Sequence, residues 1–225
     1  MGPLSLSILG ITSLLAQPAM VKDINGGSQG SAVAELLDIN GVGYFVANDG
    51  GYGKELWKTD GTTNGTVLVK DINPGINDSS PSQLVNVGGT LFFSADDGVN
   101  GKELWKSDGT ALGTVMVADI NSTAVGASST PFNLRAMSGY LAFSADDGVH
   151  GKEIWRSDGT ALGTTMIKDI NPLSGSSNPS TLTRVGGSFY FAADDGTTGL
   201  ELWKSDGTEA GTVFIKDIIA GSGGS

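Results

Sequence analysis

The stretch Glu103-Leu104-Trp105-Lys106-Ser107-Asp108-Gly109-Thr110 decides the fold, because the chain repeats it. Related copies begin at Glu55, Glu153 and Glu201, so consecutive copies are 48, 50 and 48 residues apart. A period of this length is typical of an array built from one supersecondary unit. A residue that recurs in every unit usually serves the unit, so we expect the repeated residues to be structural.

One repeat contains four segments that predict short β-strands. In the second copy they are residues 84–87, 90–95, 102–106 and 114–120. Gly88-Gly89 is a hairpin signal, and stretches rich in Asp and Gly separate the later segments. In the third segment we expect the leucine and the tryptophan of the motif on opposite sides. Four strands of about six residues, with loops of about six, account for the period.

Four antiparallel strands followed by a polar link predict the blade of a β-propeller. So small a sheet cannot cover both of its faces alone, and stacking between neighbours covers them. The alternative is a linear solenoid of the same hairpins. We favour the propeller because radial closure leaves only short, protected sheet edges. The tryptophans are expected between blades or against blade edges, as packing anchors: Trp57, Trp105, Trp155 and Trp203.

The sequence therefore predicts an all-β chain that forms a four-bladed β-propeller, with four antiparallel strands per blade. We expect a single propeller domain over residues 20–225, preceded by an apolar N-terminal arm over residues 1–19. The four repeats are expected at approximately residues 20–73, 74–121, 122–171 and 172–220.

The apolar N-terminal stretch supports two interpretations. Ala16-Gln17-Pro18-Ala19 has the small residues of a secretory cleavage site, although no Lys or Arg precedes the apolar stretch. Leu4-Ser5-Leu6-Ser7-Ile8 instead alternates with the period of a strand, which favours an ordered arm. The stretch is too short, and too interrupted by Ser, Thr and Gly, to span a bilayer comfortably. We expect no membrane span.

The fourth-strand motif occurs once more often than the other three strands. Lys-Asp-Ile or its equivalent begins at Lys22, Lys70, Ala118, Lys168 and Lys216, so the first or the last copy is in excess. An excess strand can stay unordered, open a further blade, or pair with the edge of another molecule, which repeated head to tail gives a polymer. We expect assembly to use apolar residues of both termini: Leu4, Leu6, Ile8, Leu9, Ile11, Met20, Val21, Ile24, Val213 and Ile215.

Composition argues against several classes of function. Lys and Arg number 13 against 24 Asp and Glu, a net charge of −11, whereas nucleic acid and anionic lipid both require a basic surface. The absence of Cys excludes disulfides, thiolate metal sites and Cys nucleophiles. Carboxylate pairs that recur in every copy lack the distinct environments of a glycosidase acid and base. We expect no enzymatic activity, no catalytic residue and no cofactor.

The Asp-rich loop before each motif is the one candidate metal site. Carboxylate oxygens suit Ca²⁺, but the spacing is not that of an EF-hand. Asp and Gly also form tight turns by themselves, and we favour this interpretation. A calcium site would draw on Asp96, Asp97, Glu103, Asp146, Asp147, Glu153, Asp194, Asp195 and Glu201.

Residues 91–98, with residues 103–110 and Gly113-Thr114, resemble the ELWxxDGT repeat family of bacterial secreted and surface proteins. The resemblance covers roughly residues 20 to 220, with small departures such as Ile154 in place of Leu. It implies tandem propeller repeats, an extracellular or cell-surface location, and a structural or adhesive role. The family carries no catalytic residues that could be transferred to this chain.

These observations together predict a non-enzymatic extracellular structural or adhesive protein. We expect it to self-assemble, through exchange of a terminal strand or arm, into a filament or another polymer. Two alternatives remain open: a glycan-binding module with equivalent weak pockets between its blades, and a fragment of a longer repeat array. The expected partners are copies of the chain itself and, for the first alternative, extracellular glycans.

Overall fold

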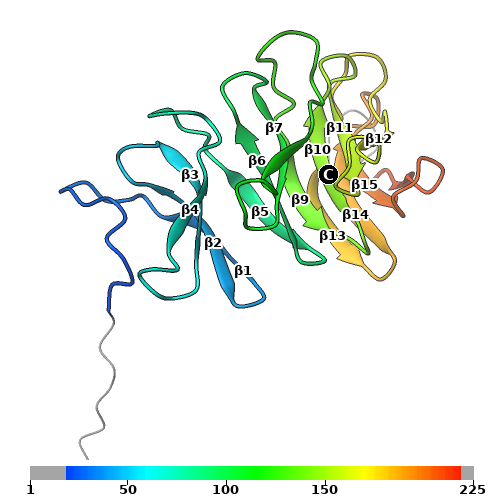
Figure 1. Ribbon diagram of the computed structural model, residues 1–225. Helices are drawn as coiled ribbons and strands as arrows, with labels where there is room; N and C mark the ends of the chain where they lie inside the picture. Colours follow the sequence, from blue (N-terminus) through cyan, green and yellow to red (C-terminus); the bar gives the residue numbers. More distant parts are fainter. Residues whose placement is uncertain (1–18, 219–225) are drawn as a thin grey trace, which may run out of the picture.

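The computed structural model describes residues 19–218, and the rest of the predicted arm lies outside this range. The described residues form sixteen strands in four antiparallel sheets (Figure 1). Strand order within each sheet follows the chain, so every sheet is a simple meander. None of the described residues belongs to a helix long and apolar enough to cross a bilayer.

Each sheet is one blade. Blades 1 and 2 contain β1 (Ala34–Ile39), β2 (Val42–Asn48), β3 (Lys54–Thr59), β4 (Val67–Lys70), β5 (Ser82–Val87), β6 (Thr90–Asp96), β7 (Lys102–Ser107) and β8 (Val115–Ala118). Blades 3 and 4 contain β9 (Phe132–Ala136), β10 (Leu141–Asp146), β11 (Lys152–Ser157), β12 (Thr165–Lys168), β13 (Ser180–Val185), β14 (Ser188–Asp194), β15 (Leu200–Ser205) and β16 (Val213–Lys216).

The repeated motif occupies the third strand of every blade. In blade 2, β7 pairs with β6 so that Trp105 lies opposite Phe93 and Leu104 lies opposite Ser94. Successive side chains of a strand point to opposite faces. Leu104 and Trp105 accordingly enter two different apolar cores, one on each side of the blade. The predicted orientation of these two residues is confirmed.

Each innermost strand is bent at the same position. Glu35, Gln83, Asn133 and Thr181 have φ values of 57°, 61°, 53° and 54°, in the left-handed region that such residues rarely adopt. In every blade this residue coincides with a register shift between the first two strands. Bulges of this kind bend a strand and increase its twist. The bend therefore belongs to the architecture of the repeat.

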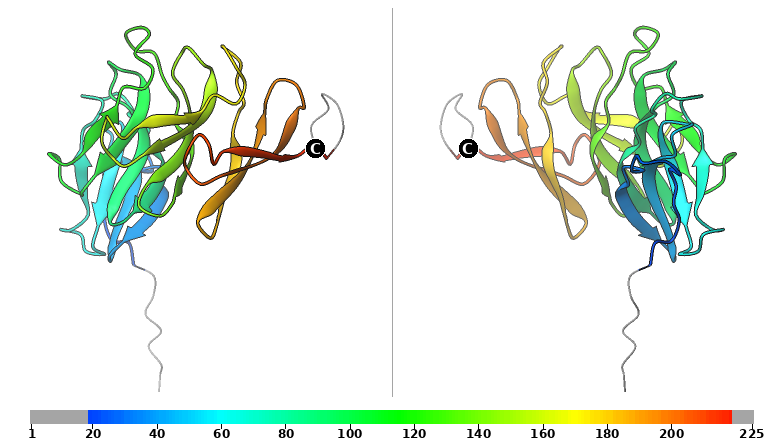
Figure 2. Two further views of the ribbon diagram at one scale, coloured as in Figure 1. Left: turned by 90° about the vertical axis from the view of Figure 1, so that its right-hand side faces the viewer. Right: turned by 90° about the vertical axis from the view of Figure 1, so that its left-hand side faces the viewer.

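The four blades stand side by side in an open arc (Figures 1 and 2). The innermost strands of consecutive blades are in contact, β1 with β5, β5 with β9, and β9 with β13. Blades 1 and 4 stand apart at the two ends of the arc in all views. The prediction of an all-β chain with four propeller blades is confirmed. The radial closure that we expected is not present within residues 19–218.

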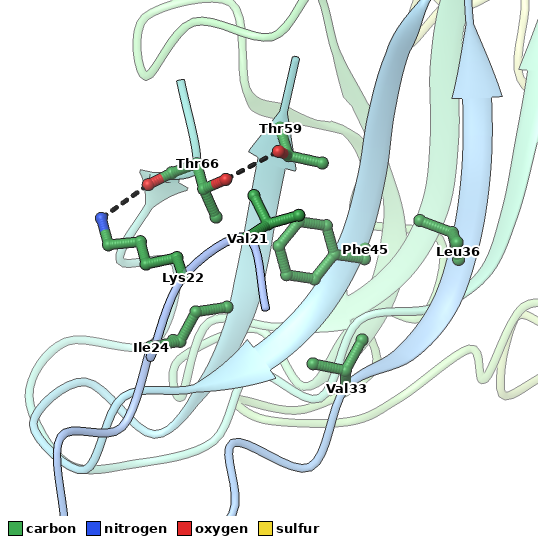
Figure 3. Close-up of a pocket in the computed structure, with 8 residues that line it drawn as sticks. All are labelled: Val21, Lys22, Ile24, Val33, Leu36, Phe45, Thr59 and Thr66. Atoms are coloured by element: carbon green, nitrogen blue, oxygen red, sulfur yellow. Dashed lines mark hydrogen bonds between the residues drawn. The ribbon is translucent and has the colours of Figure 1, made fainter. Parts of the chain in front are cut away.

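The structure decides which copy of the fourth-strand motif is in excess. The C-terminal copy completes blade 4, because β16 pairs with β15 and places Phe214 opposite Trp203. The N-terminal copy, Lys22-Asp23-Ile24, forms no strand and lies against the outer side of blade 1 (Figure 3). The excess segment is therefore the N-terminal one.

Candidate assembly interface

Three repeated interfaces join consecutive blades. We call the side of a blade that packs toward the next blade its rear face, and the opposite side its front face. Between blades 1 and 2, the rear face contributes Tyr44, Leu56 and Val69, and the front face contributes Phe93 and Trp105. All five are at most 7% exposed. Burying one large apolar side chain contributes about 1.5–3 kcal/mol, so apolar packing dominates these interfaces.

A long cationic side chain also crosses each interface. Lys58 Nζ donates to the carbonyl oxygen of Gly109 at 2.8 Å, and Arg156 Nη1 donates to that of Gly207 at 3.0 Å. Both glycines belong to Asp-Gly-Thr turns of the following blade. A Cβ atom on Gly109 would lie 2.3 Å from the hydroxyl oxygen of Tyr44. The close approach of the preceding blade therefore requires glycine in this turn.

The glutamate of the motif is a buried hydrogen-bond acceptor. The Glu103 carboxylate accepts the backbone N–H of Ile120 at 3.1 Å and of Ser129 at 2.8 Å, which fixes the link between blades 2 and 3. Burial raises the pKa of Glu103 although these hydrogen bonds lower it. The same cause raises the pKa of Glu153, and it raises that of Glu55 to about 7.

The side chains predicted as calcium candidates accept hydrogen bonds from backbone N–H groups of the protein itself. Asp97 Oδ1 accepts the N–H groups of Val99 at 2.9 Å and Asn100 at 2.8 Å, and Asp147 closes its loop in the same way. Within residues 19–218, no three His, Asp or Glu side chains are grouped to hold a metal. Other candidates accept nearby backbone N–H groups: Asp96, Asp146, Asp194, Asp195, Glu153 and Glu201.

The rear face of blade 4 is exposed, since no further blade follows within the described residues. Val185, Leu202 and Ile215 on this face are 57%, 39% and 45% exposed. The residues at the last two positions in blade 3, Ile154 and Ile167, are 0% and 5% exposed. The side chains are chemically alike, so the difference arises from the place of blade 4 at the end of the arc.

The N-terminal segment partly covers the front face of blade 1. Ile24 packs on Phe45 and Trp57, which are 4% and 6% exposed. Beside Ile24, a cavity of about 210 Å³ opens between the segment and the blade (Figure 3). Leu36 lines this cavity and is 73% exposed, whereas its counterpart in blade 3, Leu134, is fully buried. The segment therefore covers less of its blade than a preceding blade does.

The predicted assembly residues fall in different places. Val21 and Ile24 line the cavity on blade 1, and Ile215 lies on the rear face of blade 4. Met20 is 78% exposed and does not line the cavity. Val213 is 44% exposed, but the valine at its position in blade 2 is 37% exposed as well. The remaining predictions lie outside the described residues: Leu4, Leu6, Ile8, Leu9 and Ile11.

The four motif tryptophans lie on front faces and are 5–8% exposed. Val185 and Leu202, which form much of the rear face of blade 4, are not among the residues predicted from the sequence. The period contained a signal for them, because an apolar residue recurs at both positions in every repeat. Only the strand pairing assigns these positions to one face.

The residues that are not repeated also stabilise local structure. His150 Nδ1 lies 2.7 Å from Asp147 Oδ2, and this hydrogen bond raises the pKa of His150. The contact closes a loop of blade 3. Arg135 Nε donates to the carbonyl oxygen of Leu182 at 3.2 Å and so connects blades 3 and 4.

Comparison with known proteins supports the fold. No family model and no curated protein matches the chain. The crystal structure of puromycin hydrolase aligns over 81% of this chain, with a TM-score of 0.54 and 14% identity. A structure from an analysis of two prolyl endopeptidases aligns over 78%, with a TM-score of 0.50 and 10% identity.

The chain spans about a quarter of either neighbour, 27% and 24% of their lengths. Such neighbours are β-propeller proteins, and at this identity the likeness shows the fold alone. Fold and repeat together define the chain as a β-propeller protein with four repeated blades.

Proposed function

We propose that this chain is a non-enzymatic extracellular structural or adhesive protein. It assembles end to end into a filament or another polymer, with exchange of a terminal segment. The observation that carries the proposal is the rear face of blade 4. It presents Val185, Leu202 and Ile215 in the way the other blades present their counterparts to a following blade. The matching partner is the front face of blade 1 in a second copy.

The two ends of the arc are different surfaces of one repeated interface. A contact between a rear face and a front face is heterologous, because the two partners use different surfaces. Each added copy leaves one face of each kind open, so assembly continues as a filament or closes as a ring. Leu202 and Ile215 are 39% and 45% exposed. Completing their burial contributes on the order of 1 kcal/mol each.

The polar contacts of the repeated interface have counterparts at the two ends. Lys204 occupies in blade 4 the position of Lys58 in blade 1, whose Nζ donates to the carbonyl oxygen of Gly109. Gly61 is the counterpart of Gly109 on blade 1. A Cβ atom on Gly61 would meet nothing within 4 Å, so this turn has open space for an approaching blade.

Membership of the ELWxxDGT repeat family is part of this proposal and supports the extracellular location. The motif that carries the resemblance begins in the third strand of all four blades. The buried glutamates Glu55, Glu103 and Glu153 accept hydrogen bonds from inter-blade links. This structural use of the repeated carboxylates supports a non-enzymatic role.

Substitution of the rear face tests the proposal. We expect the unaltered chain to form particles larger than a monomer in light scattering after size-exclusion chromatography, and in negative-stain images. Leu202→Asp places a charge on the rear face and should leave a folded monomer. Leu162→Asp, at a position 94% exposed, is the matched control and should assemble normally. A monomeric unaltered chain, or normal assembly of Leu202→Asp, contradicts the proposal.

A glycan-binding role is the second candidate. A cavity of about 320 Å³ between blades 2 and 3 is lined by Lys102, Thr130, Phe132 and Lys152. The Phe132 side chain is 52% exposed, and an aromatic surface beside polar groups suits a sugar ring. A glycan array with the unaltered chain and Phe132→Ala tests this role, which requires binding that the substitution removes.

A further inference from the structure

The N-terminal segment makes the contacts of an inter-blade link. Lys22 Nζ donates to the carbonyl oxygen of Thr66 at 2.7 Å. At the interface of blades 1 and 2, Lys70 Nζ donates to the carbonyl oxygen of Thr114 at 2.8 Å. The two lysines belong to two copies of one motif, and the two threonines occupy equivalent positions in consecutive blades.

Ile24 and Asn25 of the segment extend this likeness. Ile24 packs on the front face of blade 1, as Ile72 packs on the front face of blade 2. The Asn25 side-chain oxygen lies 3.3 Å from the position of a Cβ atom on Gly50. The Asn73 side-chain oxygen lies in the same way 2.6 Å from the position of a Cβ atom on Gly98, the equivalent glycine of blade 2. Apolar and polar contacts of the link are thus both reproduced.

Ser31 provides a further correspondence. The backbone N–H of Asn48 donates to the carbonyl oxygen of Ser31 at 2.8 Å, and that of Asp96 donates to the carbonyl oxygen of Ser79 at 3.0 Å. Both serines follow their Lys-Asp-Ile motif at the same distance along the chain. Four separate contacts therefore place residues 22–31 where the last strand and link of a preceding blade would lie.

We propose that residues 20–31 are a removable placeholder. They occupy on blade 1 the site that receives β16 and Ile218 of a second copy, and assembly displaces them. This inference rests on the proposed end-to-end assembly. Lys216-Asp217-Ile218 has the same sequence as Lys22-Asp23-Ile24, so the two segments carry the same side chains for one site. Because both cannot occupy it, one must leave.

The N-terminal segment is the one that leaves more easily. β16 is hydrogen-bonded to β15, and the ring of Phe214 packs edge-on against Trp203 with centroids 5.5 Å apart. Residues 19–24 pair with no strand in the described part of the chain. β16 is also richer in the β-branched and aromatic residues that favour strands. Displacing the N-terminal segment therefore breaks no sheet.

The cavity beside the placeholder shows what a second copy adds. The placeholder fills only the place of the outermost strand and link of a preceding blade, and Leu36 remains 73% exposed beside it. In the internal interfaces, the rear-face residues of three further strands cover the equivalent region. Blade 4 of a second copy brings Val185, Tyr190 and Leu202 from those strands, so exchange replaces a partial cover by a complete one.

Weakening the placeholder in the full chain tests the inference. Ile24→Asp removes its apolar contact, and Lys22→Ala removes one hydrogen bond without placing a charge in the core. We expect both variants to assemble at lower protein concentration than the unaltered chain, Ile24→Asp by about tenfold. A synthetic peptide of residues 19–31 should suppress assembly of Ile24→Asp, and a scrambled peptide should not. Thermal unfolding by circular dichroism confirms that the variants are folded.

The outcomes separate this inference from the proposed function. Weaker assembly of both folded variants would mean that the N-terminal segment itself joins the neighbouring copy, which overturns the placeholder and leaves end-to-end assembly intact. If no form of the chain assembles, the proposed function fails. A labelled peptide of residues 212–218 then decides the inference. Binding to Ile24→Asp but not to the unaltered chain supports it, and absence of binding to both refutes it.

Discussion

The rear faces of blades 3 and 4 are the same surface in two situations. Ile154 and Ile167 in blade 3 are 0% and 5% exposed, whereas Leu202 and Ile215 in blade 4 are 39% and 45% exposed. The residues differ little in size or polarity. Burial in this protein is therefore determined by the neighbouring blade, because a four-stranded blade covers neither of its own faces.

The largest expected effect comes from placing an aspartate at the same position on the rear face of blade 3 and on the rear face of blade 4. Ile154→Asp buries an unpaired carboxylate between two blades and should destabilise the fold by about 4 kcal/mol or more. Leu202→Asp should change the stability of the monomer by about 1 kcal/mol or less, since water reaches this position. Urea unfolding followed by circular dichroism measures both. Equal losses of stability would contradict the distinction between the two faces.

The next effect concerns the buried acceptor of the motif. Glu153 accepts the backbone N–H groups of Ile170 and Ser177, each at 2.9 Å. Glu153→Ala leaves these buried donors without a partner, at about 1–3 kcal/mol for each group. We expect a loss near 3 kcal/mol in urea unfolding. Lys152→Ala, the adjacent control, should remain within about 0.5 kcal/mol. A similar loss in both variants would argue against a special role for the carboxylate.

Glu55, the equivalent acceptor in blade 1, predicts how stability depends on pH. Burial raises the pKa of Glu55 from 4.5 to about 7, so the folded chain binds this proton more tightly than the unfolded chain. The contribution of Glu55 is then complete below pH 4.5 and is lost as the pH rises through about 7. We expect Tm to fall between pH 5 and pH 8, and Glu55→Gln to flatten this fall. A Tm that rises across the window would show that hydrogen bonding outweighs burial.

The smallest expected effect comes from one hydrogen bond that is present at the first internal interface and absent at the second. Lys70 Nζ donates across the first interface to Thr114, whereas Ala118 stands at the same position of the second. Ala118→Lys should add a hydrogen bond to the carbonyl oxygen of Thr164 and stabilise the chain by about 0.5–1 kcal/mol. Lys70→Ala should destabilise it by a similar amount. Calorimetry measures both changes in stability. If Ala118→Lys has the same stability as the unaltered chain, the hydrogen bond adds nothing beyond the packing of the two blades.

The four blades could be predicted from the sequence, whereas the exposed faces at the two ends of the arc could be predicted only in part. The blades could be predicted because strand alternation and Asp-Gly turns are local patterns that recur four times. Ile24 and Ile215, which lie at the two ends of the arc, are among the apolar residues that the terminal motif copies singled out. Val185 and Leu202 were not singled out, because their exposure depends on whether a following blade packs on them, and none does within residues 19–218. The closure expected of the ring was wrong for the described residues, since blade number alone does not bring the first and last blades together.

The amino-acid sequence by itself determined the repeating unit, its four strands and the turns between them, because these follow from contacts between residues near each other in the chain. It also contained five copies of a motif that four blades can use only four times. Only the tertiary structure decided that Lys216-Asp217-Ile218 begins in the last strand of a blade, while Lys22-Asp23-Ile24 lies on the outside of blade 1. The physical reason is that near-identical segments suit equivalent sites, and pairing between distant strands decides which segment occupies which site.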